Sequence, residues 1–147
     1  MSELKPAPRA KRPEFRNINA FNDLPGYRWP LAAIVSGMHR ASGLIMFLLM
    51  PFIIWMFDTS VSSEFSFARF TSAFSNGIGF VPGFLVKLVA LGLIWAYLHH
   101  FFAGMRHIRM DLFHTVTKEA GKKTAQITLL LSLGLTVVLG AKLFGLY

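Results

Sequence analysis

Three apolar stretches in this 147-residue chain are long enough to cross a lipid bilayer, and they limit the possible folds more than any other feature. They cover about residues 29–57, 84–105 and 124–146. A helix needs about 20 consecutive apolar residues to cross the hydrocarbon core of a membrane. Because the backbone in lipid must satisfy its own hydrogen bonds, each stretch is predicted to be helical. The expected fold is all-α, an integral membrane unit with three transmembrane helices.

The charge of the chain fits this interpretation better than it fits nucleic-acid binding. The formal net charge is +8, but the basic residues flank the apolar stretches. Lysine and arginine in such positions set membrane topology and contact anionic lipid head groups. A nucleic-acid partner is therefore not expected. The chain has no cysteine, which excludes disulfides and thiolate-bound metal within it.

The segments outside the apolar stretches predict how the chain is divided into an arm, membrane spans and connections. Residues 1–28 are polar and rich in proline, which favours an extended arm ahead of a membrane unit at 29–147. Pro51 is expected to kink the first span. The connection 58–83 carries Phe65, Phe67, Phe70 and Phe74, which suggest a short interfacial helix.

A basic connection is expected at residues 106–123, before the third span. Lysine and arginine are concentrated in this connection and in the arm, so both are predicted to be cytoplasmic. The carboxyl terminus is then expected on the far side of the membrane.

Ionisable residues gather at the cytoplasmic end of the predicted bundle. His39 and Arg40 lie in the first half of the first span, and this topology brings them to the depth of the end of the second span. There, residues at i, i+4, i+7 and i+11 form one stripe: His100, Gly104, His107 and Asp111. Since ionisable groups are costly in a membrane, the cluster predicts a polar ligand or cofactor.

An imidazole at His100 is suited to ligate haem iron, and Gly104 one turn later would let a flat macrocycle approach the helix. The alternative is a bundle histidine that bonds a neighbouring helix. His107 lies about 10.5 Å further along the helix than His100, so the two histidines cannot both bind the same iron. At the interface, His107 is more simply a solvated or phosphate-facing residue. His99 and His114 are expected to be packing or interfacial residues.

Ser36 and Arg40 point to a second ligand. A serine hydroxyl in a membrane helix commonly bonds the preceding turn and then has no further role. Arg40, however, needs a polar partner because placing arginine at mid-helix costs roughly 2.5–3.5 kcal/mol. A quinone head group would offer carbonyl oxygens to Ser36 and a charge-bearing intermediate to Arg40. Asp111 is expected to pair with a cation, or to orient His107.

Two motifs resemble one known family. The segment Ser36–Gly43 reads Ser-Gly-Met-His-Arg-Ala-Ser-Gly and resembles the Ser-x-x-His-Arg-x-(Ser/Thr)-Gly signature of the cytochrome b membrane-anchor subunit of succinate dehydrogenase. The segment His100–Asp111 is similar to the His-x-x-x-Gly-x-Arg-His-x-x-x-Asp pattern of the same family. After Arg12-Pro13, many relatives have Ser-Pro-His-Leu, whereas this chain has Glu-Phe-Arg-Asn. The resemblance therefore does not define the docking contacts of the arm.

The resemblance implies an electron-transfer and anchor subunit of a respiratory complex of the tricarboxylic acid cycle, in the bacterial inner membrane. The implied partners are a flavoprotein subunit, an iron-sulfur subunit and a second membrane-anchor subunit, which completes the bundle. Haem b would be shared with this second anchor, and ubiquinone would be the substrate. This chain would contain neither a flavin site nor a catalytic residue.

The implied site roles fall on five residues of the motifs. His100 would be the axial haem ligand, and Ser36 and Arg40 would line the quinone site. His39, Arg40 and His107 would lie near the haem propionates. A haem-free structural anchor and the anchor of a fumarate reductase remain the alternatives.

Overall fold

The computed structural model describes residues 17–147 and contains helices only, apart from one isolated β-bridge. Three of the helices are long and apolar enough to cross a membrane, which confirms the predicted all-α fold. The arm predicted over 1–28, with Arg12-Pro13, falls largely on residues 1–16, outside the described part. The helices in this part are α1 (Leu31–Leu48), α2 (Met50–Val61), α3 (Glu64–Ser75), α4 (Gly83–Phe113) and α5 (Lys118–Leu143).

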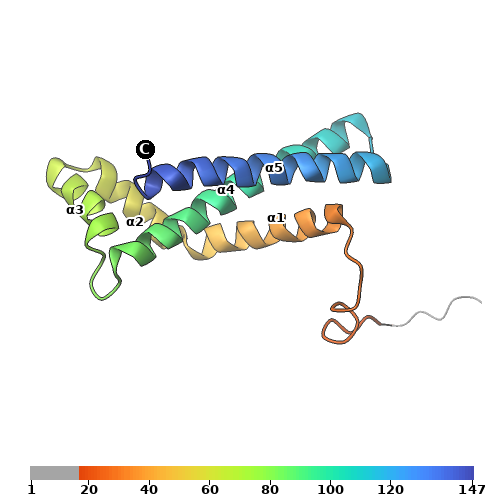
Figure 1. The fold of residues 1–147 in the computed structure, drawn as a ribbon, viewed down its shortest axis with the longest axis horizontal. Coiled ribbons are helices and arrows are strands. Elements are labelled where there is room, and N and C mark those ends of the chain that lie inside the picture. Colours follow the sequence, from red (N-terminus) through yellow and green to blue (C-terminus); the bar gives the residue numbers. More distant parts are fainter. Residues whose placement is uncertain (1–16) are drawn as a thin grey trace, which may run out of the picture.

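Figure 1 shows the three long helices α1, α4 and α5 side by side. The start of α1 and the α4–α5 connection lie at one end of the bundle. Helices α2 and α3 and the carboxyl terminus lie at the other end (Figure 1). His39 of α1 lies beside His100 and His107 of α4, so the histidines predicted to share one membrane depth are neighbours in the bundle.

The first apolar stretch is divided at Leu49, between α1 and α2. Pro51 occupies the first turn of α2, where a missing N–H costs nothing. In a continuous helix the same proline would clash with the carbonyl one turn earlier, so the chain starts a new helix there. The kink predicted at Pro51 is present as this break.

The expected short phenylalanine-rich helix is α3, which starts with a capping box. Ser63 accepts a hydrogen bond from the Ser66 backbone, and the Ser66 side chain accepts one from the Ser63 backbone. These reciprocal bonds satisfy two backbone donors that the first turn otherwise leaves free.

Helix α4 is longer than the predicted second span, and part of the predicted connection is helical. It continues through Arg106 and ends only at His114, whose φ of 50° is left-handed. Helix α5 begins directly afterwards, with the Thr117 side chain capping the Ala120 backbone. The connection is short because arginine, methionine and leucine favour helix beyond the membrane edge as well as inside it.

Small residues bring the three long helices together. Val35, Ala103 and Ala125 are buried and form the contact between α1, α4 and α5. At the other end, Gly140 faces Leu91, and a Cβ added at Gly140 would lie 2.8 Å from Leu91 Cδ1. Small residues at helix crossings are typical of membrane bundles, where close packing replaces the hydrophobic driving force.

Candidate functional site

His100 is held by the backbone of α1. Its Nδ1 lies 3.0 Å from the carbonyl oxygen of His39, which can only accept, so Nδ1 carries the proton and donates. The Ser42 hydroxyl lies 3.3 Å from the same Nδ1 and donates to the same carbonyl at 2.8 Å. The other ring nitrogen, Nε2, is then unprotonated in a neutral imidazole. Its lone pair is available to a ligand.

The space for the His100 ring is provided by Gly43. A Cβ added at Gly43 would lie 2.9 Å from His100 Cε1, which is too close for any larger residue without a shift. Gly104, which the sequence suggested would leave room for a macrocycle, instead faces His39, whose Nε2 would lie 3.8 Å from an added Cβ. The glycine that makes room at this imidazole is therefore on α1 and not on α4.

The imidazole of His39 lies between the other two histidines of the site. Its ring centroid is 4.1 Å from that of His100, with 28° between the planes, and 5.3 Å from that of His107. The structure thus brings together the three histidines that the sequence placed at one depth. They do not form a chelate, because no group of three or more His, Asp or Glu side chains within residues 17–147 could hold a metal ion.

His99 has a different environment from His100, although the two are adjacent. It is completely buried, with Nδ1 3.3 Å from the Ser132 hydroxyl of α5 and Nε2 3.4 Å from the Val35 carbonyl of α1. Trp95 stacks on the same ring at 5.6 Å. His99 is a packing residue, as expected, but its polar links to two helices were not foreseen. The only sequence signal was its quarter-turn offset from the stripe.

Ser36 and Arg40 are one turn apart on α1, so they share a face. Ser36 is half-buried and Arg40 is exposed. Within the described part of the chain, neither side chain makes a hydrogen bond. Serine and threonine elsewhere in the long helices do bond the preceding turn, as Ser42 and Thr136 show. A hydrogen bond to the preceding turn therefore accounts for Ser42, but it does not account for Ser36.

Two other predicted residues lie at the edge of this cluster. Asp111 is exposed and makes no hydrogen bond or ion pair among residues 17–147, so it does not orient His107. His114 is exposed and ends α4. Neither contributes a contact to the three stacked histidines.

The residues present fit one side of a haem. A neutral imidazole whose Nδ1 donates to a backbone carbonyl is the usual form of a histidine metal ligand, because that bond fixes the tautomer and the ring orientation. Only His100 of the two adjacent histidines offers this arrangement, since both nitrogens of His99 are engaged. His107 lies seven residues, about 10.5 Å, further along the same helix, so His100 and His107 cannot both bind one iron.

Comparisons with known proteins identify the family of the chain. Residues 12–139 match the family described as the succinate dehydrogenase/fumarate reductase transmembrane subunit. The chain is similar to the succinate dehydrogenase cytochrome b556 subunit of Coxiella burnetii (strain RSA 493 / Nine Mile phase I), with 32% identity over 132 residues, 89% of this chain and 95% of that protein. It is also similar to the subunit of the same name in Paracoccus denitrificans, with 30% identity over 112 residues, 76% of this chain and 81% of the other.

Proposed function

Because the chain belongs to the succinate dehydrogenase/fumarate reductase transmembrane subunit family, we propose that it binds haem b through His100 and helps to form the ubiquinone-reduction site. It is a multi-pass membrane subunit of the cytochrome b556 type. The observation that carries the haem proposal is the hydrogen bond from His100 Nδ1 to the His39 carbonyl, which leaves Nε2 free.

His100 would hold the haem iron through Nε2, and α1 orients its ring. The His39 carbonyl holds the ring in one tautomer, and Gly43 leaves the space in which the ring lies. Haem, when bound, exchanges single electrons at its iron. His39, Arg40 and His107 are the residues of this chain that would lie near the propionates, where a cation or an N–H donor can neutralise carboxylate charge.

Ser36 and Arg40 have the role of quinone contacts. The free Ser36 hydroxyl can donate to a quinone carbonyl oxygen, and the exposed Arg40 guanidinium stabilises negative charge that develops on that oxygen. Reduction of ubiquinone to ubiquinol needs two electrons and two protons. Ser36 and Arg40 position the quinone for this reaction, and no residue of this chain forms a covalent bond with it.

We place the chain beside a flavoprotein, an iron-sulfur subunit that delivers the electrons, and a second anchor that supplies the other haem ligand. The membrane is the bacterial inner membrane, with the amino terminus cytoplasmic. The charge distribution along the chain supports this orientation, since the end of the bundle where α1 begins also carries the basic α4–α5 connection.

The test of the haem assignment is a reduced-minus-oxidised absorbance spectrum of the complex purified with its partner subunits. In the wild type we expect a b-type haem signal. The His100→Gly variant should lose it, and imidazole added to the buffer should restore it at least in part, because the small ligand can occupy the space left by the side chain.

The matched control is His114→Asn, at the exposed end of the same helix, where asparagine tolerates the left-handed backbone. This variant should keep the full signal. Haem that persists in His100→Gly would place the ligand elsewhere, and a wild-type complex without haem would make the chain a structural anchor.

A further inference from the structure

Arg106 is a buried cation for which the described chain supplies no counter-charge. Its side chain is 7% exposed, and its only hydrogen bond among residues 17–147 runs from Nε to Thr124 Oγ1 at 3.1 Å. No carboxylate in this range lies within ion-pair distance of the guanidinium. Burying an arginine without a partner is costly, so a partner from outside this part of the chain is needed.

Arg106 lines two cavities, and its unpaired nitrogens are not fully buried. A guanidinium has five N–H donors, of which Thr124 takes one. Within the described residues, no fully buried side-chain nitrogen or oxygen lacks a hydrogen-bond partner. The remaining Arg106 nitrogens are therefore not sealed in the protein, and they can be reached from the cavities that this residue lines.

The first cavity lies where α1 begins, α4 ends and α5 begins. Its volume is ≈ 530 Å³, and it carries two lysines besides the arginine. The residues that define its character are the basic Arg106, Lys118 and Lys122, together with the apolar Leu31, Met110 and Val116. Three cations around one cavity at the predicted cytoplasmic face match a phosphate group in charge and position.

The second cavity joins Arg106 to an apolar groove between α4 and α5. It has a volume of ≈ 230 Å³ and is bounded by Arg106 and Arg109 on the polar side and by Phe102, Ile127 and Leu131 on the apolar side. These apolar residues precede Arg106 on α4 or follow Thr124 on α5, so the groove runs toward the middle of the spans.

We infer that Arg106, Lys118 and Lys122 bind the phosphate of an anionic phospholipid, whose acyl chain lies along the groove of Phe102, Ile127 and Leu131 between α4 and α5. A free phosphate ion would use only the basic cavity, whereas a lipid uses both cavities that meet at Arg106. None of the proposed haem or quinone residues lines either cavity, so this lipid site is separate from them.

The test uses the whole complex, purified in detergent and depleted of lipid. Phosphatidylglycerol, phosphatidylcholine or inorganic phosphate is then added, and bound lipid is measured by native mass spectrometry together with the thermal unfolding midpoint. The wild type should bind phosphatidylglycerol and unfold at a higher temperature with it. Phosphatidylcholine and inorganic phosphate should have much smaller effects.

The informative variants remove the cations one at a time. Arg106→Gln should weaken phosphatidylglycerol binding about tenfold, because a charge-assisted contact to phosphate is lost. Lys118→Gln, at an exposed position, should weaken it by a smaller factor of about five. Lys142→Gln, at the opposite end of the same helix, is the matched control and should change nothing.

Three outcomes would overturn the inference. Equal binding in Arg106→Gln, Lys118→Gln and the wild type would place the lipid elsewhere. A midpoint raised as much by inorganic phosphate as by phosphatidylglycerol would make the cavity a simple anion site. A wild type that does not prefer phosphatidylglycerol would mean that a protein carboxylate, from the arm or from a partner subunit, pairs with Arg106.

Discussion

At the scale of single residues, two adjacent histidines on α4 have separate roles because they point about 100° apart around the helix. His99 ties α4 to α1 and α5, and His100 keeps a free ring nitrogen. The sequence placed His100 on one stripe with His107 but could not show which ring nitrogen is engaged, since that depends on a carbonyl 61 positions away.

This division predicts the effect of His99→Phe. The phenyl ring fills similar space but makes no hydrogen bond to Ser132 or Val35. The complex should lose about 1–2 kcal/mol of stability while keeping its haem signal, because hydrogen bonds between membrane helices contribute about that amount. The unfolding midpoint and the reduced-minus-oxidised spectrum measure the two effects. Loss of haem at unchanged stability would instead identify His99 as the ligand.

A second prediction at this scale concerns the two unbonded polar side chains of α1. Ser36→Ala and Arg40→Ala should each lower the rate of ubiquinone reduction by about tenfold or more, since each removes a hydrogen bond or a charge from the quinone oxygen. Succinate oxidation by an artificial electron acceptor should be largely preserved.

The matched controls for that prediction are Ser60→Ala and Arg69→Ala. Both residues lie at the other end of the bundle, on α2 and α3. They should leave both activities unchanged. If the Ser36 and Arg40 variants lowered both activities in proportion, the proposed quinone contacts would be wrong.

At the scale of helices, the sequence predicted which elements exist better than where they end. The break at Pro51 and the short helix α3 follow from local chemistry, a proline ring and a capping serine, and both were expected. The end of α4 was not predicted, because charge after Met105 marks the membrane edge but does not stop a helix. The role of Gly43 was also missed, since it depends on packing between two helices.

The length of α4 can be tested by Ile108→Pro. Ile108 is 61% exposed, so its side chain contributes little to the core. A proline there removes a backbone hydrogen bond and clashes with the preceding turn, at a cost of about 3 kcal/mol or more inside a helix. The yield and thermal stability of the assembled complex should fall sharply. Ile108→Ala is the control with little effect, and equal behaviour of the two variants would mean that the segment is not helical in the complex.

At the scale of the whole molecule, the three long helices leave a large apolar surface. Phe47, Phe84 and Leu130 are all more than half exposed. Such side chains are stable only against lipid or another membrane subunit. Lipid or another membrane subunit must therefore cover this surface, and the proposed second anchor is one such subunit.

The orientation of the bundle can be tested because the chain has no cysteine. Single cysteines at exposed positions, Asn76→Cys and Thr115→Cys, lie at opposite ends of the bundle. In intact cells, a membrane-impermeant maleimide should label Asn76→Cys and not Thr115→Cys. Labelling after detergent treatment is the control for access, and the reverse pattern would invert the proposed topology.

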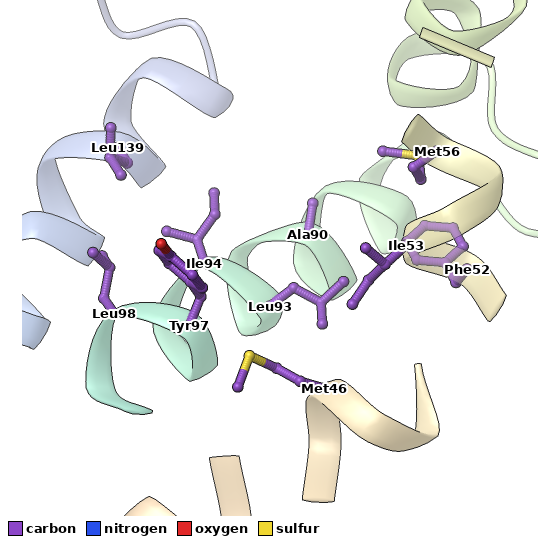
Figure 2. A pocket seen from close by; sticks show the side chains of 10 residues that line it. All are labelled: Met46, Phe52, Ile53, Met56, Ala90, Leu93, Ile94, Tyr97, Leu98 and Leu139. Carbon is purple, nitrogen blue, oxygen red and sulfur yellow. The ribbon is translucent and has the colours of Figure 1, made fainter. Parts of the chain in front are cut away.

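An apolar groove beside the α1–α2 break also belongs to this scale. An apolar cavity of ≈ 440 Å³ lies between α1, α2, α4 and α5, and its side chains come from all four helices (Figure 2). Met46 and Met56 reach into it from the two sides of the break. Flexible thioethers tolerate such irregular space better than branched side chains do.

The opposed roles of His99 and His100 also decide where the chain can change length. Adding or removing one residue before them in α4 turns the rest of the helix by about 100°, which brings one of the two rings to the direction of the other and turns the second ring away. An insertion would leave no histidine in the tie between the helices, and a deletion would leave no imidazole at the position of His100. A one-residue insertion or deletion between Gly83 and His100 therefore costs the chain one of the two histidine contacts.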